Sequence, residues 1–177
     1  MGPNRIGDDP KGALVAGGGS KMLAAYVPAG GSRFRRQHEI RLTRTMIDIK
    51  VSTVDTDGGL SVAEITSLDK GGPARHLHHG QDEWFYVVDG EYVIEVGDER
   101  YEGGPGDCIL APRKVAHVWV HLGEGTGRLI AALQPAGEIE TFFEDLAKLG
   151  STPERGALSR TFSSHGLELV GPPLSIE

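Results

Sequence analysis

The sequence predicts an all-β fold, a sandwich or barrel of short antiparallel strands, followed by one or two short C-terminal helices. Two observations lead to this prediction. Glycine (26) and proline (10) together make up about a fifth of the 177 residues, an excess over ordinary usage that favours many turns. Between about residues 40 and 135, short apolar or alternating runs recur roughly every 8–12 residues, with turn residues between them.

Each run fits a strand, because alternating residues of a strand face opposite sides of its sheet. We expect Asp89-Gly90 to form a tight two-residue hairpin turn, since this dipeptide supplies the positive φ that such turns need. The predicted strands are Met46–Val54, Leu60–Ser67, Glu83–Val88, Tyr92–Val96, Cys108–Ala111, Val115–Leu122 and Leu129–Leu133.

Helical spacing of apolar residues appears only after the last predicted strand. It predicts a helix within Gly137–Gly150, ended by its last glycine, and a second short helix near Pro153–Phe162 with proline at its first position. We expect both helices to close one side of the β core. The predicted organisation is a flexible tail (1–21) and one domain (22–177), with a barrel core at about 40–135 and a helical segment at 137–165.

Composition narrows the class of protein. The net charge of -7 disfavours binding to nucleic acid or to an anionic membrane surface. Cys108 is the single cysteine, which excludes an intramolecular disulfide and a zinc site built from several thiolates. No apolar run approaches the roughly 18 residues that cross a bilayer, so we expect a cytoplasmic protein.

Histidines are concentrated in one part of the chain. His76 and His78 are two residues apart, so on a strand both point to the same face. A turn at residues 79–82 would bring Glu83 back towards them, and His117 lies on a later strand. Three imidazoles and a carboxylate suit one divalent transition metal, whether iron, manganese, nickel, cobalt, copper or zinc. By alternation His79 faces away, and we assign no role to His38 or His165.

This spacing resembles the first motif of the cupin superfamily, in which His-x-His is followed by Glu after three or four residues and by Gly after six more. His76, His78, Glu83 and Gly90 fit it, with Gly71 one residue nearer than the usual leading glycine. The resemblance implies a double-stranded β-helix, or jelly-roll barrel, with a metal at one end.

The second cupin motif is matched in part. Gly106, Pro112 and His117 occupy their positions, whereas Lys114 replaces a glycine and His121 replaces an asparagine. Both departures concern turn details, and all four metal-ligand positions are present. Only 15 residues, 91–105, separate the two motifs, which resembles the compact single-domain cupins.

Sequence features outside the two motifs resemble those of cupins related to quercetin 2,3-dioxygenase. These features are Gln134–Gly137, Phe142-Phe143 in a helix, and Gly171–Leu174. The likeness implies a dioxygenase acting on a flavonol-like or other enolisable aromatic molecule, with dioxygen as second substrate. His76, His78 and His117 would be fixed ligands, and Glu83 both a ligand and the catalytic base. A homodimer is expected by the same analogy.

Strand alternation also nominates residues for the substrate pocket. Phe85 shares its face with Glu83, and Trp119 and His121 share theirs with His117, although His121 could equally be a strand-end residue that faces solvent. Two alternatives to the dioxygenase remain open. One is a metal-dependent isomerase, cyclase or hydrolase using Lewis-acid chemistry. The other is a barrel that binds a small molecule without turnover.

Overall fold

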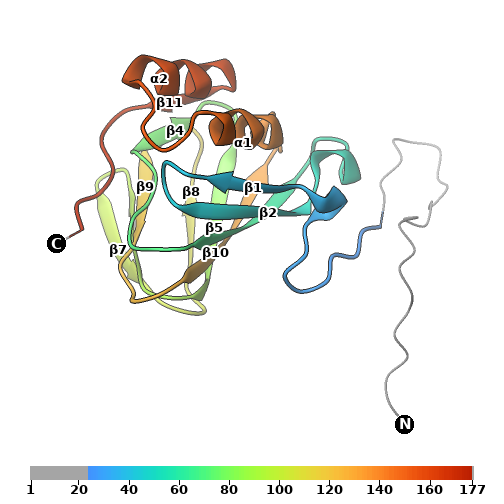
Figure 1. The fold of residues 1–177 in the computed structure, drawn as a ribbon, viewed down its shortest axis with the longest axis horizontal. Helices are drawn as coiled ribbons and strands as arrows, with labels where there is room; N and C mark the ends of the chain where they lie inside the picture. The colour runs from blue at the N-terminus through green and yellow to red at the C-terminus, as the bar shows by residue number, and fades with distance from the viewer. Residues whose placement is uncertain (1–23, 177) are drawn as a thin grey trace, which may run out of the picture.

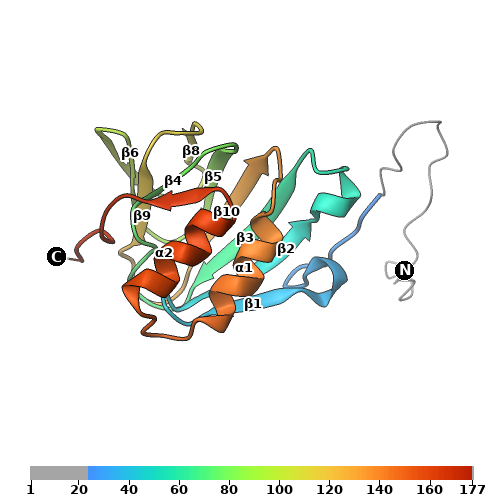
Figure 2. The ribbon, with the colours of Figure 1, turned by 90° about the horizontal axis from the view of Figure 1, so that it is seen from above.

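The computed structural model describes residues 24–176, which fold into two antiparallel sheets facing each other with two helices packed at one end (Figures 1 and 2). The six-stranded sheet has the order β1-β2-β3-β10-β5-β8, and the five-stranded sheet has the order β11-β4-β9-β6-β7. The predicted all-β class with short C-terminal helices is confirmed. The predicted tail, residues 1–21, lies outside the described residues.

The strands are β1 (Gln37–Ile40), β2 (Thr45–Val51), β3 (Ser61–Ser67), β4 (His76–His78), β5 (Asp82–Asp89), β6 (Tyr92–Val96), β7 (Glu99–Gly103), β8 (Cys108–Ala111), β9 (His117–His121), β10 (Gly127–Gln134) and β11 (Leu167–Leu169). The helices are α1 (Ile139–Lys148) and α2 (Arg155–Ser164), and two 3-10 turns, η1 (Arg33–Arg35) and η2 (Thr53–Asp55), precede and follow β2.

Alternation of side chains builds the core between the sheets. Every second residue of β3 is buried from Ser61 to Ser67, and β10 follows the same pattern. The inward apolar residues pack against those of the opposite sheet, and this burial is the main favourable contribution to folding. Typical fully buried members are Ile49, Phe85, Val87, Ile94, Ala131 and Leu133.

The expected hairpin at Asp89-Gly90 is wrong. β5 pairs with β10 and β8, whereas β6 pairs with β7 and β9, so this turn carries the chain from one sheet to the other. Gly90 does have the predicted positive φ, 93°. The two-residue hairpin lies instead at Gly97-Asp98, which joins β6 to β7 and pairs Val96 with Glu99.

The sequence pattern did not predict β1, β7 or β11. β7 is exposed along most of its length, so it carries charged residues instead of an apolar run, and β1 and β11 have only four and three residues. The second helix begins at Arg155 after Glu154, so Pro153 precedes the helix and does not occupy its first position.

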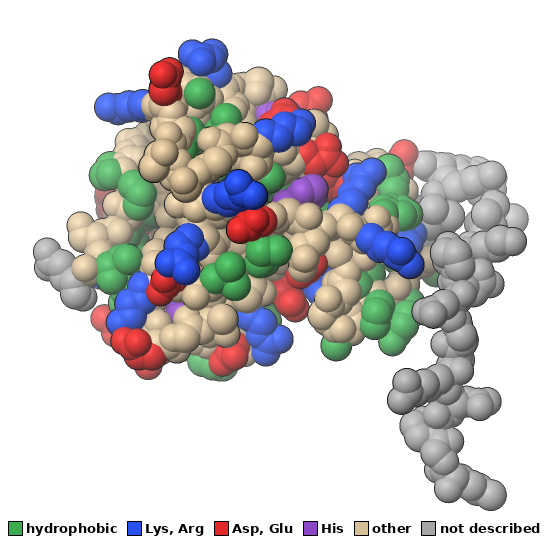
Figure 3. Space-filling model, viewed as in Figure 1, with side chains coloured by type: hydrophobic (Ala, Val, Ile, Leu, Met, Phe, Trp, Pro, Cys, Tyr) green, Lys and Arg blue, Asp and Glu red, His purple; other side chains and the backbone are tan. Residues whose placement is uncertain are grey.

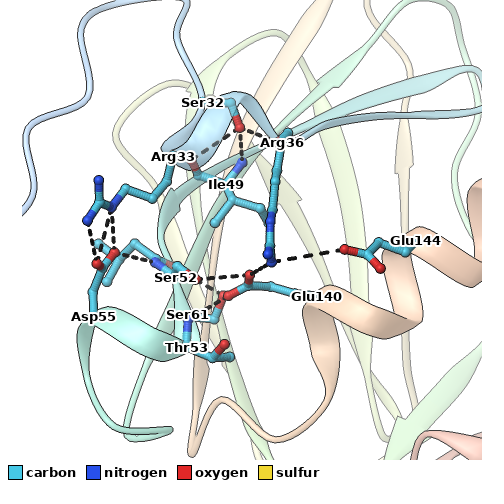
Figure 4. A network of polar contacts seen from close by, with 11 residues as sticks. Ser32, Arg33, Arg36, Ile49, Ser52, Thr53, Asp55, Ser61, Glu140 and Glu144 are labelled. Carbon is cyan, nitrogen blue, oxygen red and sulfur yellow. Dashed lines mark hydrogen bonds and ion pairs between the residues drawn. The ribbon is translucent and has the colours of Figure 1, made fainter. Parts of the chain in front are cut away.

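A polar network anchors α1 to the barrel (Figure 4). Glu140, only 4% exposed, accepts hydrogen bonds from Ser52 Oγ at 3.0 Å and from the Thr53 backbone N–H at 2.5 Å. Arg36 Nη1 lies 3.1 Å from the same carboxylate. Glu140 thereby links α1 to Arg36, which precedes β1, and to Ser52 and Thr53, which directly follow β2.

A second pair in Figure 4 fixes the segment before β1. Arg33 donates through Nε and Nη2 to the carboxylate of Asp55 at 2.8–3.1 Å. Burial would raise the pKa of Asp55, but the hydrogen bonds from Arg33 and the Ser52 backbone N–H and the charge of Arg33 together outweigh it, so the pKa is lowered. The ion pair ties η1 to η2, and with them the start of the described chain to the sheet.

On the face of Figure 3, acidic and basic side chains are interspersed, and no broad field of one sign covers it. In the described part of the chain, no helix has the length and apolar character that a membrane span requires.

Glu140→Ala is expected to lower the free energy of unfolding by about 1–3 kcal/mol, because it removes the acceptor of the buried Ser52 hydroxyl and of the partly buried Thr53 N–H. Urea denaturation measures the change. Glu144→Ala is the matched control, since Glu144 lies one turn further along α1, 4.0 Å from Arg36, and is 41% exposed. We expect this control to shift stability by less than about 0.5 kcal/mol. Equal effects of the two substitutions would contradict an anchoring role for Glu140.

Candidate metal centre

Four side chains from three strands and both sheets converge at one point. His76 and His78 come from β4, Glu83 from β5 and His117 from β9. The turn after β4 returns the chain, while antiparallel pairing sets His76 opposite His117. One ligand atom from each residue lies within 4.8 Å of all the others, so the four groups could hold a single metal ion.

All four side chains are buried, with exposed fractions of 1% to 7%. Glu83 Oε2 lies 3.0 Å from His117 Nε2 and 3.1 Å from His78 Nε2. The rings of His78 and His117 are stacked, with centroids 5.4 Å apart. The cluster is therefore compact and shielded from bulk water.

Backbone carbonyls fix the tautomers of two rings. His76 Nδ1 lies 2.9 Å from the Ala74 carbonyl, and His117 Nδ1 lies 3.0 Å from the Val115 carbonyl. A carbonyl can only accept, so each Nδ1 carries the proton and donates it. The Nε2 lone pair of each neutral ring is left for the interior of the cluster.

Gln81 fixes the third ring. Its amide nitrogen donates to the Ala136 carbonyl, which orients Oε1 towards His78 Nδ1 at 3.0 Å. His78 must then donate through Nδ1, as the other two histidines do. Gly137 makes room for this arrangement, because a Cβ there would lie 2.8 Å from the Gln81 amide nitrogen and its φ is +54°. Sequence reasoning missed Gln81, since a glutamine in a turn carries no metal-site signal of its own.

The electrostatics favour the metal-binding states of His76 and Glu83, but not that of His78. Burial, together with the neighbouring His117 and His78, lowers the pKa of His76 to about 3, so this ring is neutral at pH 7. Burial alone would raise the pKa of Glu83, but its contacts with His117 and His78 outweigh burial and hold the pKa well below the usual range. For His78 burial lowers the pKa, but the hydrogen bond and charge of Glu83 and the hydrogen bond with Gln81 together raise it. A protonated His78 must therefore lose its Nε2 proton before it can bind a metal.

The donor set fits a divalent cation. His78 Nε2 is buried and makes no hydrogen bond of acceptable geometry, although it lies 3.1 Å from Glu83 Oε2. With its proton on Nδ1, a neutral ring turns a lone pair towards the lone pairs of the carboxylate, and this contact is repulsive unless positive charge lies between them. A proton on His78 supplies that charge at one contact, whereas one cation would satisfy all four groups.

An apolar cavity lies over the cluster, with a volume of about 540 Å³ including the part open to solvent. His76, His78 and Glu83 form one part of its wall, and Thr43 and Thr45 form another. The other described lining residues are apolar and come from both sheets and both helices: Ile40, Ile47, Ile65, Pro73, Trp119, Ile139, Phe142, Phe143, Leu146, Phe162 and Leu167. The helices that close the core thus also form part of the cavity wall.

The structure separates the three nominated pocket residues. Trp119 lines the cavity. Phe85 is 1% exposed and packs beside the His117 ring, centroids 6.0 Å apart, but the cavity wall does not include it. His121 is fully buried away from both cavity and solvent, and Cβ atoms added at Gly90 or Gly127 would lie within 3 Å of its ring. Four residues separate it from His117, about 13 Å of strand.

The remaining histidines lie outside the cluster. The exposed His79 contacts Glu168 at 3.3 Å, in keeping with its predicted outward direction. His165 packs at the end of α2 with its Nε2 3.0 Å from Asp145. His38 is on β1, and Cys108 is exposed.

His78→Ala is expected to abolish stoichiometric binding of Zn²⁺, because it removes one of four ligands. Gln81→Leu should weaken binding by roughly 10–100-fold, the usual cost of losing a partner that orients a ligand. Competition with a chromophoric chelator measures both affinities. His79→Ala is the matched control, being the next residue with an exposed side chain, and should bind as the unmodified protein does. Loss of binding in this control, or full binding by His78→Ala, would contradict the site.

The comparisons with known proteins agree with this architecture. Residues 65–133 match the family model described as the cupin domain. An uncharacterized protein of Streptomyces coelicolor is 33% identical over 69 residues, which are 39% of this chain and 66% of that protein, just under two thirds of its length.

Two solved structures align with this chain at low sequence identity, and the first of them supports the fold. A PAC13 variant from Streptomyces, determined with uridine, aligns with a TM-score of 0.50 and 15% identity over 64% of this chain and 84% of that one. An RmlC-like cupin from Shewanella frigidimarina aligns with a TM-score of 0.49 and 23% identity over 59% and 86%. The matched family segment runs from β3 to β10 and holds all four residues of the cluster. Residues 65–133 therefore match the cupin-domain model, and the described chain has the all-β barrel of the cupin fold.

Proposed function

We propose that this protein is a metal-dependent enzyme acting on a largely apolar small molecule, and specifically a dioxygenase of the quercetin 2,3-dioxygenase kind. One observation carries the proposal: the buried cluster of three histidines and Glu83 opens into a cavity with apolar walls. Four protein ligands leave positions open on a five- or six-coordinate metal, which is typical of catalytic sites. A bound divalent transition metal would polarise substrate oxygens and, if redox-active, would permit electron transfer to dioxygen.

In this proposal Glu83 accepts the proton of a substrate hydroxyl. Its contacts with His78 and His117 both run through Oε2, which leaves Oε1 to accept a proton from a substrate hydroxyl. The depressed pKa keeps the carboxylate ionised but also makes it a weak base, so the transfer needs a substrate hydroxyl whose own pKa a bound metal would lower. His76 and His117 are held by backbone carbonyls, so they stay in place while the carboxylate turns.

The cavity walls favour one class of substrate. Among the described lining residues there is no lysine or arginine, so a phosphate or carboxylate away from the metal cluster would meet no countercharge. Trp119, Phe142 and Phe143 offer aromatic surface to a planar ring. The same walls would exclude water from the reacting groups, which strengthens the electrostatic interactions among them.

The proposal predicts oxygen consumption when the metal-loaded protein is mixed with a flavonol, measured with an oxygen electrode over a panel of divalent metals. Glu83→Gln should lower kcat by about 100-fold or more, because it removes the base while keeping the side-chain shape. Glu168→Gln is the control, since this exposed glutamate contacts only His79 among the histidines, and its kcat should be unchanged.

Conversion of the flavonol without oxygen uptake would overturn the dioxygenase assignment and favour an isomerase, cyclase or hydrolase. Tight binding of flavonol and metal without any product would favour the binding protein. The cluster and the cavity are compatible with all three functions, and oxygen uptake together with product formation distinguishes among them.

A further inference from the structure

The cavity has a second polar feature besides the metal cluster. Thr43 and Thr45 are the hydroxyl-bearing side chains among its described lining residues. Their Oγ1 atoms lie 2.8 Å apart. Thr45 is 3% exposed and begins β2, whereas Thr43 is partly exposed in the turn between β1 and β2.

Strand register places the threonine pair at the opposite end of the six-stranded sheet from Glu83. Thr45 pairs with Ser67 at one end of β3, while Glu83 pairs with Leu133, which pairs with Ser61 at the other end. Six residues separate Ser61 from Ser67, about 20 Å of strand. Side chains reach into the cavity from both ends and shorten this distance. The cavity wall between the two polar ends is apolar.

The two hydroxyls have hydrogen-bonding capacity to spare. One O–H satisfies the contact between them, and the only other acceptor near Thr43 Oγ1 among the described residues is the Ile40 carbonyl at a long 3.4 Å. If Thr43 donates to Thr45, the Thr45 O–H has no partner. If Thr45 donates to Thr43, the Thr45 oxygen keeps its lone pairs. Either way the pair can donate to or accept from a ligand.

We propose that Thr43 and Thr45 form a distal subsite that binds a hydroxyl or carbonyl oxygen at the end of the ligand remote from the metal cluster. The ligand class is then an elongated, mostly aromatic or apolar molecule with one oxygen group at each end. This inference rests on the proposed function only for the oxygen group of the ligand that faces the metal cluster. The distal contact itself depends only on the threonine hydroxyls and the apolar cavity between them and the cluster.

The test compares two probes that differ at the distal end, 3-hydroxyflavone and 3,4′-dihydroxyflavone, by titration calorimetry on the metal-loaded full chain. The unmodified protein should bind the dihydroxy probe about three- to tenfold more tightly, as one additional hydrogen bond predicts. Thr45→Val keeps the shape of the side chain and should abolish this preference while leaving the affinity for 3-hydroxyflavone unchanged. Thr45→Ser retains a hydroxyl and should restore the preference.

Thr66→Val is the matched control, because Thr66 lies next to this region on β3 but on its outward side, and the preference should persist. If Thr45→Val fails to fold, Thr43→Val provides the same comparison at a partly exposed position. Equal affinity of the unmodified protein for both probes, or a preference that survives in both valine variants, would overturn the subsite while leaving the proposed function standing. Binding of neither probe would contradict the aromatic substrate class itself.

Discussion

Three imidazoles and a carboxylate are buried together in an otherwise apolar barrel, and the surrounding chain is arranged to satisfy them. Unpaired polar groups in such an interior are costly. His76 and His117 each begin a strand and each donates to the carbonyl two residues earlier, which lies outside the strand and is free of its ladder. His78 ends its strand and uses Gln81 instead. The outer nitrogens are satisfied locally, and the inner ones are left to a cation.

Much of the site could be predicted from the sequence, because it depends on two periodicities. Alternation places His76 and His78 on one face, and a short turn returns Glu83. Neither rule reveals Gln81, whose role follows from the Ala136 carbonyl, 55 residues away in the sequence. The crossover between the two sheets at Asp89-Gly90 was not predicted, for a similar reason. A turn signal reports local backbone geometry, whereas the choice of sheet depends on which strands are available to pair.

The helices illustrate another limit of sequence patterns. The spacing of Phe142 and Leu146 predicts an amphipathic helix but not the surface that it covers. In the structure these residues lie over the cavity, and the buried Glu140 on the same helix is tied to Ser52 and Thr53. The position of the cavity wall is therefore set by a polar network outside the cavity, which the apolar pattern of the helix does not reveal.

The distribution of polarity along the cavity constrains the chemistry more than its volume does. A ligand that fills an apolar space displaces its water, and every polar group of the wall must then find its partner on the ligand. At one end those groups are the residues that could hold a metal, and at the other they are two hydroxyls with unused capacity. A molecule polar at only one end would leave the spare hydrogen-bonding capacity of the threonine pair unused, whereas one polar in the middle would lose hydration against Ile47 and Ile65 without compensation. The barrel therefore selects by the spacing of oxygen atoms along the ligand, and this selection is independent of which metal occupies the cluster.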